Sequence, residues 1–509
     1  MELQPTARLV DCVLAIAAQD PARELIVAGD ERLSYRDVAD AAQALAVRLT
    51  SAGLQPGARV AYLGCPGPGF LISQLATHLV GAVWMGLNPR YTAAELAPLL
   101  ENARPGIIFI EGEVGPEATA EMHAAANDLA PQPVIHGSAR WSDLADLEGP
   151  IPPTAVPLDP EIALLVYTSG TTGVPKGACL SHRAVMAAAG LYAERYAHPG
   201  LRSLLNLPIN HVGALIDLTA AAIAMGGTLI AMSDFQPAVI PDVLRAERIT
   251  ILGQVPTMHL MIEAQGGAYD PEHYPALRHV VWSGAAMPRS FIERHHGRGI
   301  ELSTCYGQTE CTGSVTFTSP DADIDELAAS VGRPAVSRLL RIVGADGEPV
   351  LVGEPGEVQI SGDCVMSGYL GRPEQTAEAF VDGWLRTGDL GMIDERGALR
   401  LVGRLKEMFK SGGYNVYPRE IETVLEEHPA IAAAAVVAMP DSVWQEVGWA
   451  FLITLPGASD ADISTFARTR LANFKVPKRF ILSAELPLLP IGKIDKRALQ
   501  EAARAGVYG

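Results

Sequence analysis

Short apolar runs alternate with longer Ala- and Leu-rich segments through most of this chain. The segments Tyr35–Ala52 and Ala93–Asn102 predict helices, whereas the apolar runs predict buried strands. Such alternation favours α/β architecture with largely parallel sheets. Strands are expected at Val60–Leu63, Ile107–Ile110, Leu164–Tyr167, Thr228–Ala231, Ile251–Gln254 and His279–Trp282.

The pattern changes from about Ser330, where turn residues multiply and the apolar runs shorten. This predicts a small β-rich subdomain that closes the large domain. Its strands are expected at Arg338–Val343, Gly356–Ser361, Gly388–Ile393 and Ala398–Val402.

A boundary is expected at Gly403–Lys406, because a self-contained α+β pattern follows it. That pattern is large enough for a small domain of its own. We therefore expect a large domain over residues 1–402, a hinge over 403–406 and a small C-terminal domain over 407–509. After a hairpin, the small domain is predicted to contain a helix at Pro418–Glu427, strands at Ile431–Met439 and Val447–Leu455, and a helix at Ser464–Asn473.

Length and charge narrow the class of protein. A chain of 509 residues is too long for a single hydrophobic core, so at least two domains are expected. Its composition, with 48% hydrophobic and 19% charged residues, is ordinary for a soluble enzyme. The formal charge of −19 argues against nucleic acid and anionic membrane as partners. Val212–Met232 is long enough to cross a membrane, but Gly226 and Gly227 divide it, so we predict a buried helix followed by a strand.

Six cysteines without a Cys-x-x-Cys pair favour a reducing cytoplasm. The amino terminus lacks the basic head and apolar core of a signal peptide. The sequence leaves the oligomeric state open, a homodimer included.

The segment Tyr167–Ala178 reads YTSGTTGVPKGA and carries the strongest chemical signal. Glycines let backbone N–H groups face an anion, hydroxyls add neutral donors and a lysine adds charge. The segment departs from the P-loop pattern at Pro175 and Gly177. We predict a polyphosphate cradle made by Thr168, Ser169, Gly170, Thr171, Thr172, Gly173 and Lys176.

This string resembles the nucleotide-phosphate loop of the adenylate-forming superfamily, which includes acyl-CoA synthetases, luciferases and peptide-synthetase adenylation domains. Further motifs follow in the superfamily's order, so the resemblance covers residues 20–500. It implies ATP, Mg²⁺ and coenzyme A as cofactors and a C-terminal domain that rotates about a hinge at Lys406.

Two motifs resemble the superfamily's nucleotide site. The first, Ser283–Ala286, follows a predicted strand and implies an adenine slot, where small residues admit a flat ring. The second, Tyr306–Glu310, implies a tyrosine stacked on the base, a threonine on a phosphate oxygen and a carboxylate on Mg²⁺, which prefers hard oxygen ligands. The residues so implied are Gly284, Ala285, Ala286, Tyr306, Gly307, Thr309 and Glu310.

Two further motifs imply contacts with the ribose and with the acceptor. The resemblance implies that Asp389 accepts the ribose hydroxyls and that Arg404 is a second contact to the ribose or to a phosphate. Gly412 and Gly413 resemble the loop that lines the pantetheine tunnel of acyl-CoA synthetases, which favours coenzyme A over a carrier protein.

Lys493, in a Pro-x-Gly-Lys motif, matches the superfamily's catalytic lysine. The chain departs from the usual pattern just before it, where Leu488 and Leu489 replace a basic residue and a threonine. A lysine here would bridge the carboxylate and the α-phosphate as two anions come together.

The segment Asn206–Gly213 resembles the border of the acyl pocket and places His211 at its mouth, although a core histidine is the alternative. No aspartate occupies the place where amino-acid-activating relatives bind an amine, although Asp234 is close. A hydrophobic carboxylic acid is therefore the expected substrate. The slot is expected to be lined by Gly213, Ala214, Leu215, Ile216, Gly313 and Ser314.

The residues and the resemblance together predict an enzyme that converts an acid to acyl-AMP and transfers the acyl group to coenzyme A, releasing AMP and pyrophosphate. A free-standing enzyme that loads a carrier protein remains the main alternative. A luciferase-like oxygenase and a non-catalytic nucleotide-binding relative are two others.

Overall fold

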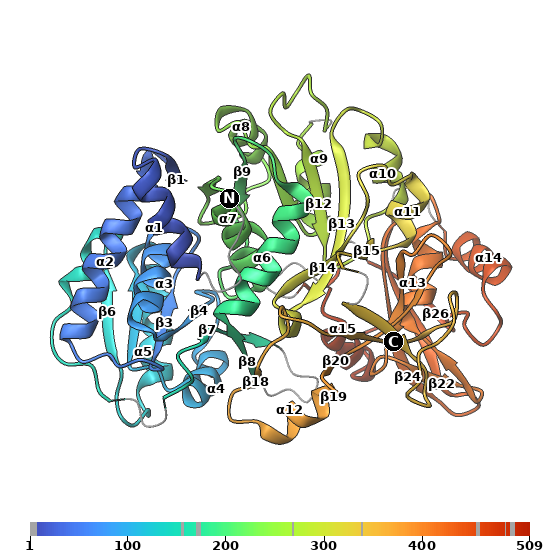
Figure 1. The fold of residues 1–509 in the computed structure, drawn as a ribbon. Coiled ribbons are helices and arrows are strands. Elements are labelled where there is room, and N and C mark those ends of the chain that lie inside the picture. The colour runs from blue at the N-terminus through green and yellow to red at the C-terminus, as the bar shows by residue number, and fades with distance from the viewer. Residues whose placement is uncertain are drawn as a thin grey trace.

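The computed structural model describes residues 8–153, 157–168, 175–266, 269–336, 339–454, 459–483, 485–488 and 494–508. They form a large N-terminal α/β domain built on two sheets, a smaller β-sheet beside them, and a small C-terminal α/β domain (Figure 1). The mixed α/β class and the division into a large and a small domain agree with the prediction.

The first large sheet is mostly parallel and has antiparallel pairs at both edges. It carries the adenine-slot and Tyr306 motifs on neighbouring strands. In sheet order the strands are β15 (Arg333–Pro334), β14 (Gly313–Phe317), β13 (Glu301–Gln308), β12 (His279–Ser283), β11 (Ile251–Gln254), β9 (Arg202–Leu205), β10 (Thr228–Ala231), β1 (Glu24–Ala28) and β2 (Glu31–Ser34).

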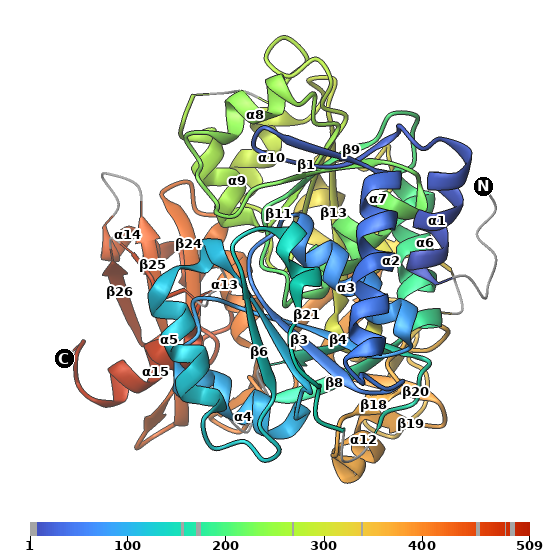
Figure 2. The ribbon, with the colours of Figure 1, turned by 90° about the vertical axis from the view of Figure 1, so that its left-hand side faces the viewer.

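The second large sheet buries both of its faces. Alternate residues of its central strands enter two different cores: Tyr62 and Phe109 pack in one, Leu63 and Ile110 in the other. Figure 2 shows α4 and α5 beside one face and α2 and α3 beside the other. In sheet order the strands are β18 (Gly368–Tyr369), β8 (Lys176–Ser181), β7 (Ile162–Thr168), β4 (Val83–Leu87), β3 (Arg59–Leu63), β5 (Ile107–Glu111) and β6 (Val134–Ser138).

Capping explains where the two predicted helices begin. Ser34 and Asp37 satisfy each other's backbone N–H at the start of one, and Thr92 and Glu95 form the same capping box at the other. Helix α6 contacts both β7 and β14, so it lies between the two sheets. The helices of the large domain are α1 (Leu9–Gln19), α2 (Tyr35–Ser51), α3 (Pro68–Val80), α4 (Ala93–Ala103), α5 (Gly115–Ala126), α6 (His182–Tyr196), α7 (Ala221–Ala224), α8 (Ile240–Ala246), α9 (Pro256–Glu263), α10 (Arg289–His295), α11 (Ile324–Ala329) and α12 (Pro373–Ala379), with short 3₁₀ turns η1 (Gly112–Val114), η2 (Trp141–Asp146) and η4 (Thr309–Cys311).

The segment 212–232 forms a buried helix and then a strand, as predicted, but its first part is a π-helix, η3 (Gly213–Ala220), that continues into α7. π-Helical turns are rare and occur often at functional sites. Among the described residues, no helix is both long and apolar enough to span a bilayer.

The predicted β-rich segment forms a sheet of short antiparallel strands. Its longest strand, β20 (Trp384–Ile393), pairs on both edges and leads through β21 (Leu399–Arg404) to the expected hinge. The other strands are β16 (Leu340–Val343), β17 (Gly356–Ile360) and β19 (Phe380–Val381).

The C-terminal part has hydrophobic cores of its own, on the two faces of a sheet. The helix predicted at 464–473 is displaced: it begins at Asp460, because the Ser459 hydroxyl accepts from the Asp462 N–H at 3.2 Å and caps it. The elements are β22 (Phe409–Ser411), β23 (Tyr414–Val416), α13 (Pro418–Glu426), β24 (Ile431–Asp441), β25 (Gln445–Thr454), α14 (Asp460–Arg470), β26 (Arg479–Ser483) and α15 (Lys496–Arg504).

Lys496 connects the first residues of the C-terminal domain to helix α13. Its Nζ lies 2.9 Å from Glu407 Oε2 and 2.8 Å from Glu422 Oε1. Glu407 follows the expected hinge directly, whereas Glu422 is buried on α13 and accepts from the Val436 N–H at 2.8 Å. The chain is thus fixed to the small domain one residue after Lys406.

A half-buried carboxyl group, that of Glu111, lies at the carboxyl ends of β3 and β5. The Cys65 N–H donates to Glu111 Oε2 at 2.9 Å. Burial raises the pKa of Glu111 from 4.5 to about 7. Because the folded pKa exceeds the unfolded one, the folded state binds the proton more tightly.

We therefore expect the stability associated with Glu111 to be lost as pH rises from about 4.5 to about 7. Glu111→Gln should flatten the pH dependence of the free energy of unfolding over this range by up to about 3.5 kcal/mol, since the pKa rises from 4.5 to about 7 and one pKa unit corresponds to about 1.4 kcal/mol. Urea unfolding at a series of pH values measures it. Glu117→Gln, which alters an exposed carboxylate on α5, is the control; parallel wild-type and Glu111→Gln curves would contradict the prediction.

Candidate active site

Asp389 joins two other predicted nucleotide-site residues, Tyr306 and Arg404. Its carboxylate, on β20, is 5% exposed. The Tyr306 hydroxyl donates to Oδ2 at 2.7 Å, and Arg404 Nε lies 2.9 Å from Oδ1. Burial together with the Asp389 charge raises the pKa of Tyr306, so this phenol remains a donor. The side chain of Arg404 is 58% exposed, which leaves it accessible to a ligand.

The hairpin of β13 and β14 leaves no room for a side chain at Gly307. A Cβ there would lie 1.8 Å from the Gly313 carbonyl oxygen. On the neighbouring strand β12, the chain leaves the sheet through Gly284, which has a φ of +83°. Gly284, Ala285 and Ala286 are all exposed, as expected for a slot that admits a flat ring.

Glu310 and Lys176 both contact the side chain of Tyr369. Glu310 belongs to η4, directly after Thr309, and its Oε1 accepts from the Tyr369 hydroxyl at 2.8 Å. Lys176 begins β8, and its Nζ lies 4.9 Å from the centre of the Tyr369 ring. The structure thus brings together the expected phosphate-binding cation and the expected metal-binding carboxylate.

The predicted phosphate loop connects two antiparallel strands. Thr168 ends β7 and pairs with Lys176 of β8. Ser169, Gly170, Thr171, Thr172 and Gly173 lie outside the described residues, as does Lys493. Their assignments stay predictions.

His211 and the acyl segment lie at the start of the π-helix η3. His211 is half-buried, and its carbonyl accepts from the Leu215 N–H at 3.1 Å. Six residues after His211 is Asp217, which accepts from the Ser314 N–H at 3.1 Å and from the Ser314 hydroxyl at 2.8 Å. Burial raises the pKa of Asp217 to about 6. A buried carboxyl group thus connects η3 to Ser314, two of the segments expected to line the apolar slot.

The paired glycines form the turn between β22 and β23. Gly412 and Gly413 have φ values of +57° and +86°, which suit a two-residue hairpin turn. A Cβ on Gly412 would lie 2.7 Å from the Trp444 ring. Beyond the turn, Tyr414 is 59% exposed and stacks on Phe474 with ring centres 4.4 Å apart.

The expected hinge is held on both sides. The Leu405 N–H donates to the Gly388 carbonyl at 2.9 Å, which fixes it to β20. Glu407 is fixed to Lys496 as described above. Lys406 is the residue between these two attachments.

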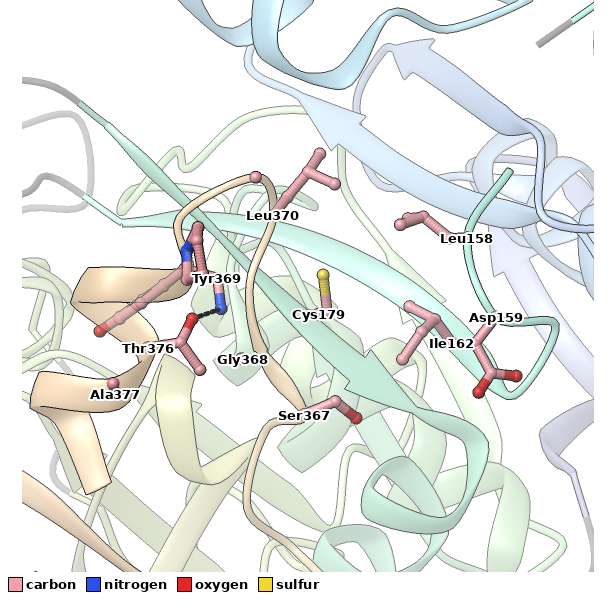
Figure 3. Close-up of a pocket in the computed structure, with 12 residues that line it drawn as sticks. Leu158, Asp159, Ile162, Cys179, Ser367, Gly368, Tyr369, Leu370, Thr376 and Ala377 are labelled. Carbon is pink, nitrogen blue, oxygen red and sulfur yellow. Dashed lines mark hydrogen bonds between the residues drawn. The ribbon is translucent and has the colours of Figure 1, made fainter. Parts of the chain in front are cut away.

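An open groove of about 470 Å³ lies along β8 and β18, next to the Glu310–Tyr369 contact. Figure 3 shows Cys179, Ser367 and Leu370 on its walls, with Leu158 and Ile162 opposite. Its lining is mainly apolar side chains and backbone. We assign it no role in the reaction.

Two residues of this site were not predicted. Tyr369 is in a turn-rich stretch without a chemical motif, so nothing local indicated that it reaches Glu310. Asp217 did give a signal, because it is the only charged residue in an apolar segment. The sequence did not show that Ser314 is its partner.

The Glu310 carboxylate fits a Mg²⁺ ion. Mg²⁺ is commonly held by one or two carboxylates together with substrate phosphates and water. In the part of the chain that the structure describes, no group of three or more His, Cys, Asp or Glu side chains could hold a metal. A single carboxylate beside the expected phosphate loop suits an ion that arrives with the nucleotide.

The comparisons identify the family. The AMP-binding enzyme family model matches residues 14–370, and the AMP-binding enzyme C-terminal domain matches residues 420–493. The chain is 36% identical over 483 residues to a feruloyl-CoA synthase of Amycolatopsis sp, covering 94% of this chain and 96% of that protein. It is 32% identical to the fatty acid–[acyl-carrier-protein] ligase ScoC of Streptomyces coeruleorubidus, covering 95% and 94%.

A solved structure agrees with these relatives. The fatty acyl CoA synthetase of Mycobacterium tuberculosis superposes with a TM-score of 0.75 at 30% identity, covering 98% of this chain and 99% of that one. The chain belongs to the AMP-binding enzyme family, and within it to the adenylate-forming acyl-CoA ligases.

Proposed function

We propose that this ligase activates a hydrophobic carboxylic acid with ATP and passes the acyl group to coenzyme A. The observation that carries the proposal is the buried Asp389, held by Tyr306 and Arg404 beside the exposed Gly284–Ala286 turn. A buried carboxylate with fixed donors is a strong acceptor for the two hydroxyls of a ribose. The nucleoside is thereby oriented toward Glu310 and Lys176.

In the first step the substrate carboxylate attacks the α-phosphate, and pyrophosphate leaves. Both reactants are anions, so the site needs donors and cations where charge accumulates. We assign this work to Thr168 through Gly173, Lys176, Thr309 and Lys493. Bound Mg²⁺, held by Glu310, would neutralise charge on the leaving phosphates.

In the second step the coenzyme A thiolate attacks the acyl carbon, and AMP leaves. The Gly412–Gly413 turn is the proposed wall of the pantetheine tunnel. It belongs to the same domain as Lys493 yet serves the other step, so the domain must rotate between steps. The two attachments beside Lys406 support this residue as the pivot.

The acyl site supports a hydrophobic acid. Ala214, Leu215 and Ile216 are buried in η3, and His211 is at its start. The named relatives act on an aromatic acid and a fatty acid, both largely apolar. Asp217 adds one buried polar position to this otherwise aliphatic wall.

We also propose coenzyme A as the acceptor and the cytoplasm as the compartment. The exposed Tyr414–Phe474 stack has Lys475 Nζ 5.8 Å from the Phe474 ring centre, and Lys478 Nζ lies 4.7 Å from that of Trp444. Aromatic faces with cations suit an adenine nucleotide such as the end of coenzyme A. Because the chain is similar to the fatty acid–[acyl-carrier-protein] ligase ScoC, loading of a carrier protein is the second candidate. The six free thiols support the cytoplasm.

A panel of carboxylic acids tests the proposal through pyrophosphate release. We expect aromatic and fatty acids to exceed amino acids by at least about 10-fold in kcat/KM, since an apolar pocket leaves a charged amine unpaired. Coenzyme A and a phosphopantetheinylated carrier protein are then offered in parallel to the enzyme with its best acid. Pyrophosphate release that does not depend on an added acid, or a preference for amino acids, would refute the proposed substrate class. Acylation of the carrier protein but not of coenzyme A would refute coenzyme A as the acceptor.

A further inference from the structure

Tyr369 touches both of the proposed triphosphate-binding charges with different parts of one side chain. Its hydroxyl donates to Glu310 Oε1 at 2.8 Å, and the face of its ring is 4.9 Å from Lys176 Nζ. A phenol hydrogen bond to a carboxylate is charge-assisted, and a cation over an aromatic face is attracted by the ring quadrupole. The same residue therefore fixes an anion and a cation.

The backbone around Tyr369 is anchored to both partners' segments. Residues 366–370 begin with the Met366 N–H donating to the Glu310 carbonyl at 2.9 Å and end with the Leu370 N–H donating to the Gly177 carbonyl at 2.8 Å. In between, Tyr369 pairs with Ala178 in the sheet. The 366–370 segment thus connects η4 to β8.

The backbone of Tyr369 is also held by α12. The Tyr369 N–H donates to the Thr376 hydroxyl at 2.9 Å, and that hydroxyl donates to the Arg372 carbonyl at 2.8 Å (Figure 3). The backbone contacts on both sides of Tyr369 thus fix the direction in which its hydroxyl donates to Glu310 Oε1.

We propose that Tyr369 is a positioning residue that sets Lys176 and Glu310 in register for the triphosphate and its metal ion. This inference rests on the proposed function, because it takes Glu310 as the Mg²⁺ ligand and Lys176 as a phosphate contact. The proposed role of Tyr369 is exerted through Glu310 and Lys176, not through contact with the nucleotide or the acid. Its action is to hold the carboxylate in one orientation and the lysine at one place before the nucleotide arrives.

Two substitutions separate the two contacts. Tyr369→Phe keeps the ring beneath Lys176 and removes the hydroxyl from Glu310. Tyr369→Leu removes both. A matched control is Tyr167→Phe, which deletes a hydroxyl on strand β7 of the same sheet that donates to Asn102 Oδ1 at 2.8 Å.

Binding of Mn²⁺ in the presence of α,β-methylene-ATP, measured by electron paramagnetic resonance, is the decisive readout because it involves no turnover. We expect Tyr369→Phe to weaken Mn²⁺ binding by about 10- to 100-fold, as loss of a hydrogen bond behind a metal ligand does. Nucleotide binding in EDTA should be unchanged in Tyr369→Phe and about 2- to 5-fold weaker in Tyr369→Leu. Tyr167→Phe should match wild type in both assays.

Glu310→Gln distinguishes failure of this inference from failure of the proposed function. If Glu310→Gln weakens Mn²⁺ binding while Tyr369→Phe stays within about twofold of wild type, the role of Tyr369 is wrong and the metal site stands. If neither substitution changes Mn²⁺ binding, Glu310 is not the ligand and the proposed metal site falls. Equal weakening in Tyr167→Phe would show a general structural effect and would also overturn the inference.

Discussion

Lys493→Ala is expected to slow acyl-adenylate formation by about 10²–10³-fold, the typical cost of removing one transition-state contact to developing negative charge. Thioester formation from acyl adenylate supplied in the assay should be retained. The reason is that only the first step brings a carboxylate against a phosphate. Pyrophosphate exchange measures the first step, and coenzyme A consumption with synthetic acyl adenylate measures the second.

The control for loss of a nearby cation is Arg497→Ala. Arg497 is four residues further along, and its exposed side chain pairs with Glu501 at 2.8 Å on the surface of α15. It should leave both steps unchanged. Equal loss of the two steps in Lys493→Ala would contradict the assignment, because it would indicate damage to the domain and not to one reaction.

Lys406→Pro is expected to impair thioester formation more than adenylation. Proline fixes φ near −65°, which restricts the pivot between the Leu405–Gly388 and Glu407–Lys496 attachments. A reacting group that stops about 1 Å short can cost about 10²-fold in rate. Single-turnover measurements of adenylate formation and of acyl-CoA formation compare the two steps in the same preparation.

Lys406→Ala serves as the control for loss of the side chain alone, and it should reduce acyl-CoA formation less than the proline variant. Wild-type yields of both adenylate and thioester in Lys406→Pro would refute the pivot at this residue. Loss of adenylation together with thioester formation would place the essential flexibility elsewhere.

Strands with continuous apolar runs were the most predictable part of the fold. Thr228–Ala231 and Ile251–Gln254 have the predicted limits, because both faces of these strands are buried and the run itself marks their ends. The helix α14 was misplaced because its start depends on a serine cap and its apolar face is weak. The π-helical turn at Gly213–Ala220 has the same composition as an α-helix, so the sequence could not distinguish them.

The candidate site was predictable where one short motif carries the chemistry. Tyr306, Glu310 and Asp389 are predicted from such motifs, and the structure adds that Tyr306 and Asp389 bond to each other. The contact of Tyr369 with Glu310 could not be predicted, because it depends on how β18 adds to the edge of the second sheet. Long-range pairings of this kind leave no local pattern.

The two ion pairs of Lys496, with Glu407 and with Glu422, bear on the timing of the proposed reaction. Under the proposed rotation about Lys406, Lys493 and the Gly412–Gly413 turn would move together as parts of one domain. The proposed order of steps then requires the activated acid to survive for as long as the rotation takes. How long the mixed anhydride survives in that interval decides how much of it reaches the thiol and how much is lost to water.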